Sequence, residues 1–212
     1  MIRSIFPLLV LLLSASSALA SSSYYPLHPT DAQAVYILPE QFGVRGDGVA
    51  DDTPGIQKAI DQLQEKNRQG VVFLPSGRYR ITHTIHIWPG VRVIGYGNTR
   101  PVLVLGANTP GFQGDGTNMV MFTGNRPPAV QTDRGMETPE AKISDGTPGT
   151  FYSALSNVDF EIQDGNPGAI GVRGRYAQHC YLAHIDFHIG SGLAGIHDSE
   201  IGRASCRERV WR

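Results

Sequence analysis

The sequence has little charge and almost no cysteine. Charged residues make up 17% of the 212 positions, and the net charge is −1. This balance provides no basic surface for nucleic acid or for an anionic membrane, so we expect neither partner. Two cysteines, Cys180 and Cys206, are too few for the disulfide framework of a small exported domain. We expect Cys180 to be a buried, unreactive thiol.

The sequence also lacks an apolar run of the about 20 residues that cross a bilayer, so we expect no membrane anchor. A short run, Ile5–Leu13, follows the basic Arg3. It precedes Ala18-Leu19-Ala20, which has the small residues of a cleavage site. Residues 1–20 are therefore predicted to be a secretory signal peptide that is cleaved before Ser21. We expect a secreted protein, either extracellular or periplasmic.

The last residues, 200–212, differ from the rest of the chain. They contain four arginines and no apolar periodicity, and EIGRASCRERV resembles the translation of a sequencing adapter. We expect this segment to be non-native and the natural protein to continue beyond Ser199. The alternative is a genuine basic tail.

Between these ends, short apolar segments bounded by Gly, Pro, Asn or Asp indicate strands. They are residues 71–74, 79–87, 91–94, 102–105, 120–122, 157–162, 169–172 and 180–189. Only one segment has helical periodicity: Thr53 is a candidate N-cap, Pro54 suits the first helical position, and apolar residues then repeat up to Leu63. One amphipathic helix before many strands predicts a cap over the open end of a strand stack.

Two internal repeats support such a stack. Asn157–Ile162 matches His184–Ile189 at an offset of 27 residues, and Gly168–Gly171 matches Gly192–Gly195 at an offset of 24. Periods of roughly 20–30 residues in a strand-rich chain are typical of solenoid coils. A β-sandwich is the alternative, but its strands recur at about 8–12 residues. The polar segment 131–150 is predicted to be an exposed loop inserted between coils.

Three ordered segments carry a resemblance to a known superfamily: FGVRGDGVADDT (42–53), IQKAID (56–61) and VFLPSGRY (72–79). They resemble the N-terminal module of pectate-lyase-like proteins. The resemblance implies an all-β, single-stranded, right-handed parallel β-helix with an N-terminal capping α-helix, incomplete at the C-terminus of this chain. We assign residues 21–39 to an N-terminal extension and residues 40–199 to this β-helix.

The run from Asn157 to Asp198 resembles a branch near glycoside hydrolase family 55, the β-1,3-glucanases. That resemblance implies two β-helices side by side, with the catalytic acid and the groove contributed largely by the second. It implies a polysaccharide substrate. We expect no cofactor. Because the chain ends before a second module, we expect this chain itself to be inactive and its catalytic groove to be missing.

The motif Gly46-Asp47-Gly48 and the following Asp51, Asp52 and Thr53 hold three carboxylates within a few residues of the helix start. We interpret the motif as structural: the glycines permit a tight turn, and the acidic residues with Thr53 satisfy amides at the helix start. The spacing does not fit a calcium loop.

The best local catalytic candidates come from the 27-residue repeat. If Val158, Phe160 and Ile162 point inward, then Asp159 and Glu161 point outward, with Asp186 and His188 beside them on the next coil, at the strand spacing of about 4.8 Å. We call Asp159, Glu161, Asp186 and His188 the outer ladder. Hydrolysis of a glycosidic bond needs two carboxyl groups about 5–5.5 Å or about 6.5–9.5 Å apart.

Like charges this close are expected to raise the pKa of one carboxyl group in the outer ladder, as a general acid requires. The alternative is a solvated outer face whose charges only keep the sheet soluble.

The histidines do not indicate a metal site. His83 and His86 are three residues apart on one predicted strand and hence on opposite faces, and the spacing of His179, His184 and His188 is not that of a zinc site. Aromatic residues that are candidate platforms for sugar stacking, or alternatively packing residues, are Trp88, Tyr96, Tyr152 and Tyr181.

Three functions remain open. The first is an exported glycoside hydrolase that cleaves a β-glucan with a carboxylate pair. The second is a polysaccharide lyase acting on uronates, which normally needs calcium and a basic residue. The third is a non-catalytic β-helix that binds polysaccharide or forms a surface adhesin or tail fibre. The polar outward positions favour an enzyme over a trimeric fibre, and the sequence indicates no oligomeric state.

Overall fold

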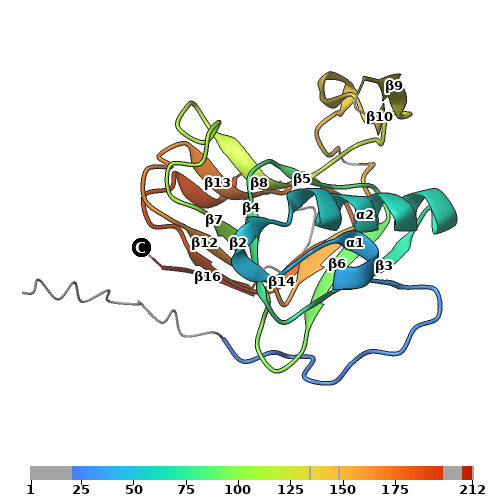
Figure 1. The fold of residues 1–212 in the computed structure, drawn as a ribbon, viewed down its shortest axis with the longest axis horizontal. Coiled ribbons are helices and arrows are strands. Elements are labelled where there is room, and N and C mark those ends of the chain that lie inside the picture. The colour runs from blue at the N-terminus through green and yellow to red at the C-terminus, as the bar shows by residue number, and fades with distance from the viewer. Residues whose placement is uncertain (1–20, 134, 148, 198–206, 212) are drawn as a thin grey trace, which may run out of the picture.

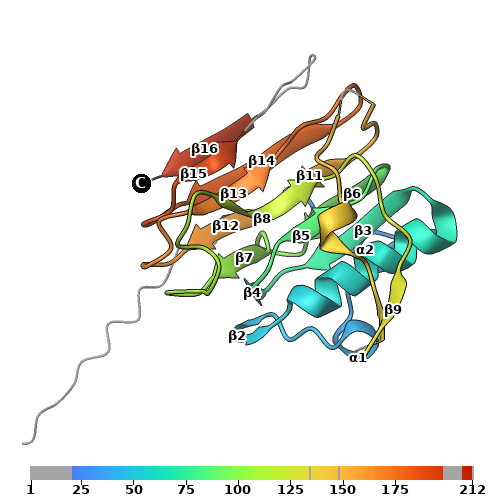
Figure 2. The ribbon, with the colours of Figure 1, turned by 90° about the horizontal axis from the view of Figure 1, so that it is seen from above.

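The computed structural model describes residues 21–133, 135–147, 149–197 and 207–211, the last of these for the backbone only. The strands wind as successive coils, which stack from a helix at one end to the strand nearest the C-terminus at the other (Figure 1, Figure 2). The expected all-β parallel β-helix is confirmed. The predicted signal peptide, residues 1–20, lies outside the described residues.

The coils form three faces whose strand pairs are all parallel. Face 1 contains β1 (Val35–Tyr36), β3 (Gly70–Pro75), β6 (Val91–Tyr96), β11 (Ala154–Ser156) and the first half of β14 (Tyr181–His188). Face 2 contains β2 (Asp47–Asp51), β4 (Arg78–Ile81), β7 (Val102–Leu105), β12 (Asp159–Ile162) and the second half of β14. Face 3 contains β5 (Ile85–Ile87), β8 (Thr117–Phe122), β13 (Ala169–Arg173) and β15 (Ala194–His197). Strand β16 (Arg207–Trp211) pairs with β14 in parallel.

Apolar side chains stack in columns inside the coils. On face 1, Val72 and Val93 are in register, and Leu155 continues the column. On face 2, the rings of Phe160 and Phe187 stack at 4.9 Å, which is the register of the 27-residue repeat. The void between α2 and the coils beneath it measures only about 10 Å³, so side chains fill this part of the core. Burying one such side chain contributes about 1.5–3 kcal/mol, and these columns hold the faces together.

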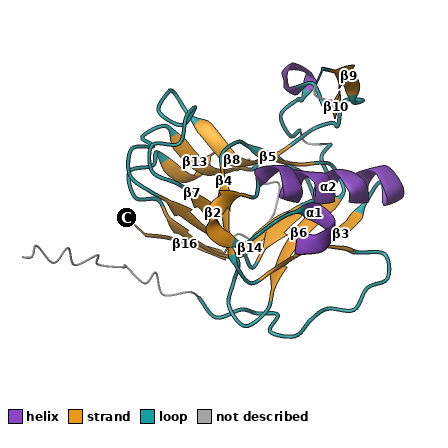
Figure 3. Ribbon diagram, viewed as in Figure 1, coloured by secondary structure: helices purple, strands orange, loops and turns teal. Residues whose placement is uncertain are grey.

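Helix α2 (Thr53–Asn67) is the predicted cap, and it begins one residue before the first helical position that the sequence indicates. It packs against β1, β3 and β5 at the first coil, and Figure 3 shows it as the one long helix in the described part of the chain. Its buried side chains are Thr53, Ile56, Ala59, Ile60 and Leu63. Two short helices, α1 (Pro39–Phe42) and 3₁₀ helix η1 (Glu140–Lys142), were not predicted, because a single turn shows no periodicity. Across the residues that the structure describes, no helix has the length and apolar character needed to cross a bilayer.

The glycine–aspartate motif is structural, but its bonds differ from those expected. Asp52 occupies the N-cap position, but its side chain forms no capping hydrogen bond. Its carboxylate instead accepts hydrogen bonds from the amides of Arg45 (2.6 Å) and Gly46 (3.0 Å) and so fixes the preceding turn. Thr53 is the first residue of the helix rather than its cap, and its hydroxyl accepts a bond from the amide of Thr82 on the next coil (2.8 Å). Burial raises the pKa of Asp52, and its two amide donors offset part of that rise.

Part of the glycine–aspartate motif is also a strand. Asp47–Asp51 forms β2, the edge strand of face 2, with Gly46 and Gly48 in the left-handed region at φ 62° and 76°. Asp51 does satisfy an amide at the helix start, that of Thr53.

Two predicted strands are broken at corners between faces. Residues 79–87 form β4 and β5, because the chain turns at 82–84. In the segment 157–162, Asn157 is a left-handed corner with φ 59°, and β12 begins only at Asp159. An alternating pattern continues through such a corner, so it does not reveal the break.

In the predicted inserted loop, residues 131–150, the first part stands outside the strand stack (Figure 1). It contains an antiparallel hairpin of β9 (Val130–Thr132) and β10 (Gly135–Glu137), together with η1. The end of the segment returns to the coil, where Asp145 forms a β-bridge with Thr123 and Thr150 is buried. Asp145 ties it to face 3 through Arg173 (2.6 Å) and Arg175 (3.4 Å). Burial acts to raise the pKa of Asp145, but the two arginines outweigh it and hold the pKa below the usual value.

Candidate functional site

The outer ladder has the register that the repeat predicts. Glu161 on β12 lies beside His188 on β14, and Asp159 hydrogen-bonds the backbone amide of Asp186 (2.9 Å). The inward residues Val158, Phe160 and Ile162 are buried, so the ladder does lie on the outer side of face 2.

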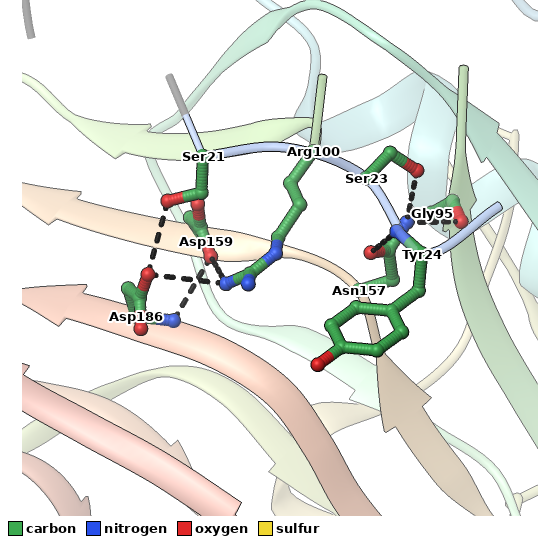
Figure 4. Close-up of polar contacts among 8 residues, drawn as sticks. All are labelled: Ser21, Ser23, Tyr24, Gly95, Arg100, Asn157, Asp159 and Asp186. Carbon is green, nitrogen blue, oxygen red and sulfur yellow. Dashed lines mark hydrogen bonds and ion pairs between the residues drawn. The ribbon is translucent and has the colours of Figure 1, made fainter. Parts of the chain in front are cut away.

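Two carboxylates of the ladder belong to a buried ion cluster. The guanidinium of Arg100 lies 3.0 Å from Asp159 and 3.1 Å from Asp186 (Figure 4). The side chains of Asp159, Arg100 and Asp186 are only 4%, 12% and 16% exposed. The alternative of a freely solvated outer face is therefore wrong for Asp159 and Asp186.

Glu161 is also occupied. Its carboxylate accepts a hydrogen bond from Arg78 (2.7 Å) and another from Gln163 (3.0 Å). Burial acts to raise the pKa of Glu161, but these bonds outweigh it, and the pKa lies below its ordinary value. The expectation that like charges raise the pKa of a carboxyl group is wrong at Glu161, because the positive charge and the hydrogen bond of Arg78 favour the ionised carboxylate.

The start of the N-terminal extension covers this region. Residues 21–25, which we call the strap, lie over face 2 and the corner beside it (Figure 4). The ring of Tyr24 stacks on His184 at 3.5 Å, and Ser21 donates a hydrogen bond to Asp186 (3.0 Å). The amide of Tyr24 donates to the side-chain oxygen of Asn157 (2.9 Å). The strap thus occupies space in which a substrate of Asp159 and Asp186 would have to lie.

Sequence reasoning missed Arg78, Arg100 and the strap. Each contact joins residues far apart in the chain: Arg100 and Asp186 are 86 positions apart, and Ser21 and Asp186 are 165 apart. No local pattern carries that information. A basic residue two positions before a buried strand, as Arg100 stands before β7, was the one available signal.

A second candidate site is a cleft of about 840 Å³ between the outer side of α2, the corner before β5, and the inserted hairpin. Its floor includes His83, His86 and Trp88, and its far wall includes Met136 and Glu140. This volume lies in the range of about 300–1,000 Å³ that small-molecule sites occupy.

The floor of this cleft is held by a hydrogen-bond network. Asp61 accepts bonds from the Trp88 indole (2.6 Å) and from Gln57 (3.0 Å), and Gln57 in turn accepts a bond from the amide of His86 (2.8 Å). Burial lowers the pKa of His86, so its imidazole is neutral near neutral pH and combines a donor with an acceptor. This hydrogen-bonded floor and the exposed Met136 on the far wall suit a ligand that has both hydroxyl groups and an apolar face.

The cleft corrects one expectation. His83 and His86 were placed on opposite faces of one strand, but the chain turns between them and both line the cleft. Within the described ranges, no three His, Cys, Asp or Glu side chains are grouped so as to hold a metal ion.

The aromatic candidates separate by burial. Trp88 and Tyr96 are 1% and 7% exposed, so they are packing residues rather than platforms. Tyr152 is 46% exposed and stacks on His179 of the next coil at 5.0 Å. Tyr181 is half-buried.

Comparison with known proteins gives a match across this fold. The family model described as rhamnogalacturonase A/epimerase, pectate lyase-like, matches residues 40–202. The chain belongs to this family. A glucan 1,3-beta-glucosidase from Cochliobolus carbonum is 26% identical over 196 residues, which cover 80% of this chain and 23% of that protein. Alginate lyase 7 from Azotobacter vinelandii is 51% identical over 43 residues, which cover 20% of this chain and 5% of that protein.

Among solved structures, the A-module of a mannuronan C-5 epimerase from Azotobacter vinelandii is similar, with a TM-score of 0.45 and 17% identity. That match covers 83% of this chain and 48% of the epimerase chain. Membership of the pectate-lyase-like family places this chain in a carbohydrate-active enzyme family. The chain spans less than a quarter of the length of the glucosidase that it matches.

Proposed function

We propose that this chain is the N-terminal β-helix part of an exported glycoside hydrolase that acts on a β-1,3-glucan-type polysaccharide. The observation that carries the proposal is the glucan 1,3-beta-glucosidase relative, whose similarity extends over 80% of the chain rather than over the capping motif alone. In this proposal residues 40–199 form the scaffold.

The cleft beside α2 is the proposed contact with the polysaccharide. A pyranose ring presents hydroxyl groups at its edge and C–H groups on its face. The neutral imidazole of His86 and the carboxylate of Glu140 can hydrogen-bond the hydroxyl groups, and the side chain of Met136 can pack against the C–H face.

The outer ladder has no catalytic role in this proposal. Each of its carboxylates binds an arginine, so none is free to protonate a leaving group or to attack a sugar carbon. The hydrolytic pair of carboxyl groups would be supplied by other parts of the natural protein.

The test is retention of the secreted 212-residue chain by insoluble polysaccharides, together with a reducing-sugar assay. We expect retention by β-1,3-glucan and no release of reducing sugar. The double variant Met136→Ala/Glu140→Gln should reduce retention, whereas Lys66→Ala, in the last turn of α2, should not. Release of reducing sugar by the wild type that is lost in Glu161→Gln would overturn the structural assignment of the ladder.

An activity on uronates is the second candidate. Lys58 lines the cleft and has no polar partner among the residues that the structure describes, so it is available to a carboxylate on a sugar. The short match to alginate lyase agrees with this candidate. Retention by alginate but not by β-1,3-glucan, abolished by Lys58→Ala alone, would favour it over the hydrolase. Equal failure with every polysaccharide would contradict both.

A further inference from the structure

The ion cluster under the strap has an unbalanced charge. Asp159 and Asp186 are two carboxylates, and Arg100 is the cation bound to both. A buried charge is costly unless it is paired, and a net negative charge in so enclosed a place calls for a second cation.

Ser21 lies directly over this cluster. Its hydroxyl donates to Asp186 (3.0 Å), and its carbonyl accepts a hydrogen bond from the backbone amide of Arg100 (3.0 Å) (Figure 4). The next residue, Ser22, forms a β-bridge with Thr99. Ser21 is therefore held from two sides, and its backbone nitrogen is joined to the bound hydroxyl through Cα and Cβ alone.

Ser21 is also the residue that the predicted cleavage exposes. Hydrolysis of the Ala20–Ser21 peptide bond by a signal peptidase adds water across the bond. It leaves a carboxylate on Ala20 and a free amine on Ser21, and the amine takes up a proton near neutral pH.

We propose that the α-ammonium group of processed Ser21 is the second cation of the Asp159–Arg100–Asp186 cluster, so that removal of the signal peptide locks the strap onto face 2. An unprocessed chain has a neutral amide at the same place and leaves the cluster one positive charge short. Processing at this bond thereby completes a structural site rather than only releasing the chain.

The surroundings determine the sign of the pH dependence. The groups that face Ser21 are Asp186 of β14, Asp159 of β12 and Arg100, with Tyr24 and the imidazole of His184 farther along the strap. Pairing with the carboxylates raises the pKa of the α-amino group above its ordinary value of about 7.7–8.0. Its stabilising effect is therefore complete below the ordinary pKa and is lost as the pH rises through the raised pKa.

The experiment first identifies the N-terminus of the secreted chain by mass spectrometry. An N-terminus other than Ser21 overturns the proposal. The pKa of the Ser21 α-amino group is then measured from the pH dependence of its labelling by an amine-reactive reagent, read on the N-terminal peptide. We expect a pKa at least about one unit higher in the folded chain than in urea, which is a tenfold tighter binding of the proton. A pKa equal to or below the value in urea refutes the proposal.

Two comparison chains separate the ammonium group from the strap itself. A chain with Gly-Ala added before Ser21 keeps the strap but moves the ammonium group away. We expect it to unfold at a lower temperature than the Ser21 chain at pH 7, with the difference disappearing near pH 10. In an Asp186→Asn background the same addition should have little effect. A difference between the two chains that persists in that background, or that is independent of pH, overturns the proposal.

Discussion

Asn157 links the strap to the coil, and its replacement gives the sharpest test of this structure. The residue is fully buried at the corner between β11 and β12 and has a left-handed backbone, with φ 59°. Its side-chain nitrogen donates to the carbonyl of Gly95 (2.8 Å) and to the hydroxyl of Ser23 (2.8 Å). Its side-chain oxygen accepts the amide of Tyr24 (2.9 Å).

The cost of Asn157→Ala follows from two separate losses. The buried carbonyl of Gly95 loses a donor, at about 1–3 kcal/mol, while the bonds to Ser23 and Tyr24 contribute less because water can replace them. Alanine in the left-handed region costs about 1–2 kcal/mol more than glycine does. We expect a loss of about 3–4 kcal/mol for Asn157→Ala and about 2 kcal/mol for Asn157→Gly. For a domain of this size, 3 kcal/mol corresponds to a fall in Tm of about 6–12 °C.

Urea unfolding of the wild type and both variants measures these losses, and chymotrypsin cleavage after Tyr24 reports release of the strap. Both variants should be cleaved faster than the wild type under native conditions, since both lose the bonds to the strap. Equal stability of the alanine and glycine variants would refute the backbone argument. A loss below about 1 kcal/mol in both would refute the hydrogen-bond argument.

Three further predictions concern charge and burial. Asp159→Asn removes one of the two carboxylates that Arg100 binds and leaves Asp186 as its partner, so it should cost about 1.5–3 kcal/mol. Glu161→Gln, whose pair is partly exposed and screened, should cost under about 1 kcal/mol. The reverse order in urea unfolding would contradict the assigned partners. The pKa of Asp145 is lowered in the folded chain, so its stabilising effect is present above the ordinary pKa and is lost as the pH falls. Asp145→Asn should therefore unfold more easily than the wild type at pH 7, by roughly 1 kcal/mol after screening, and the two should converge in acid. Burial raises the pKa of the Cys180 thiol, so in a Cys206→Ser background it should react with a thiol reagent only after unfolding, and rapid reaction of the native chain would contradict its burial.

The coils could be predicted from the sequence because the buried residues repeat at the same spacing as the coils. Phe160 and Phe187 are 27 positions apart in the chain and stack directly in the structure, so one offset gave the register of β12 on β14. The capping helix could also be predicted, since Pro54 suits a helix start and the apolar positions up to Leu63 have helical spacing.

The corners between faces and the partners of the charged residues could not be predicted from the sequence. Asn157 interrupts its predicted strand because its backbone is left-handed, and an asparagine in a sequence does not by itself indicate that conformation. Its side chain hydrogen-bonds Gly95 and Ser23, which are 62 and 134 positions away in the chain. The cleft beside α2 likewise depends on where the inserted hairpin lies, and nothing in segment 131–150 indicates that it approaches His86.

The outer ladder shows why carboxylate spacing alone is a poor guide to catalysis in a β-helix. Neighbouring coils are about 4.8 Å apart, so any acidic residue that recurs in register resembles the pair of a retaining glycosidase, whose carboxyl groups are about 5–5.5 Å apart. The same proximity is unfavourable for two charged carboxylates, and the fold must supply either a shared proton or a cation. Here Arg100 lies between Asp159 and Asp186, and Arg78 binds Glu161. The discriminating observation is therefore the position of the nearest guanidinium, and an acidic ladder whose carboxylates each bind one is a structural feature.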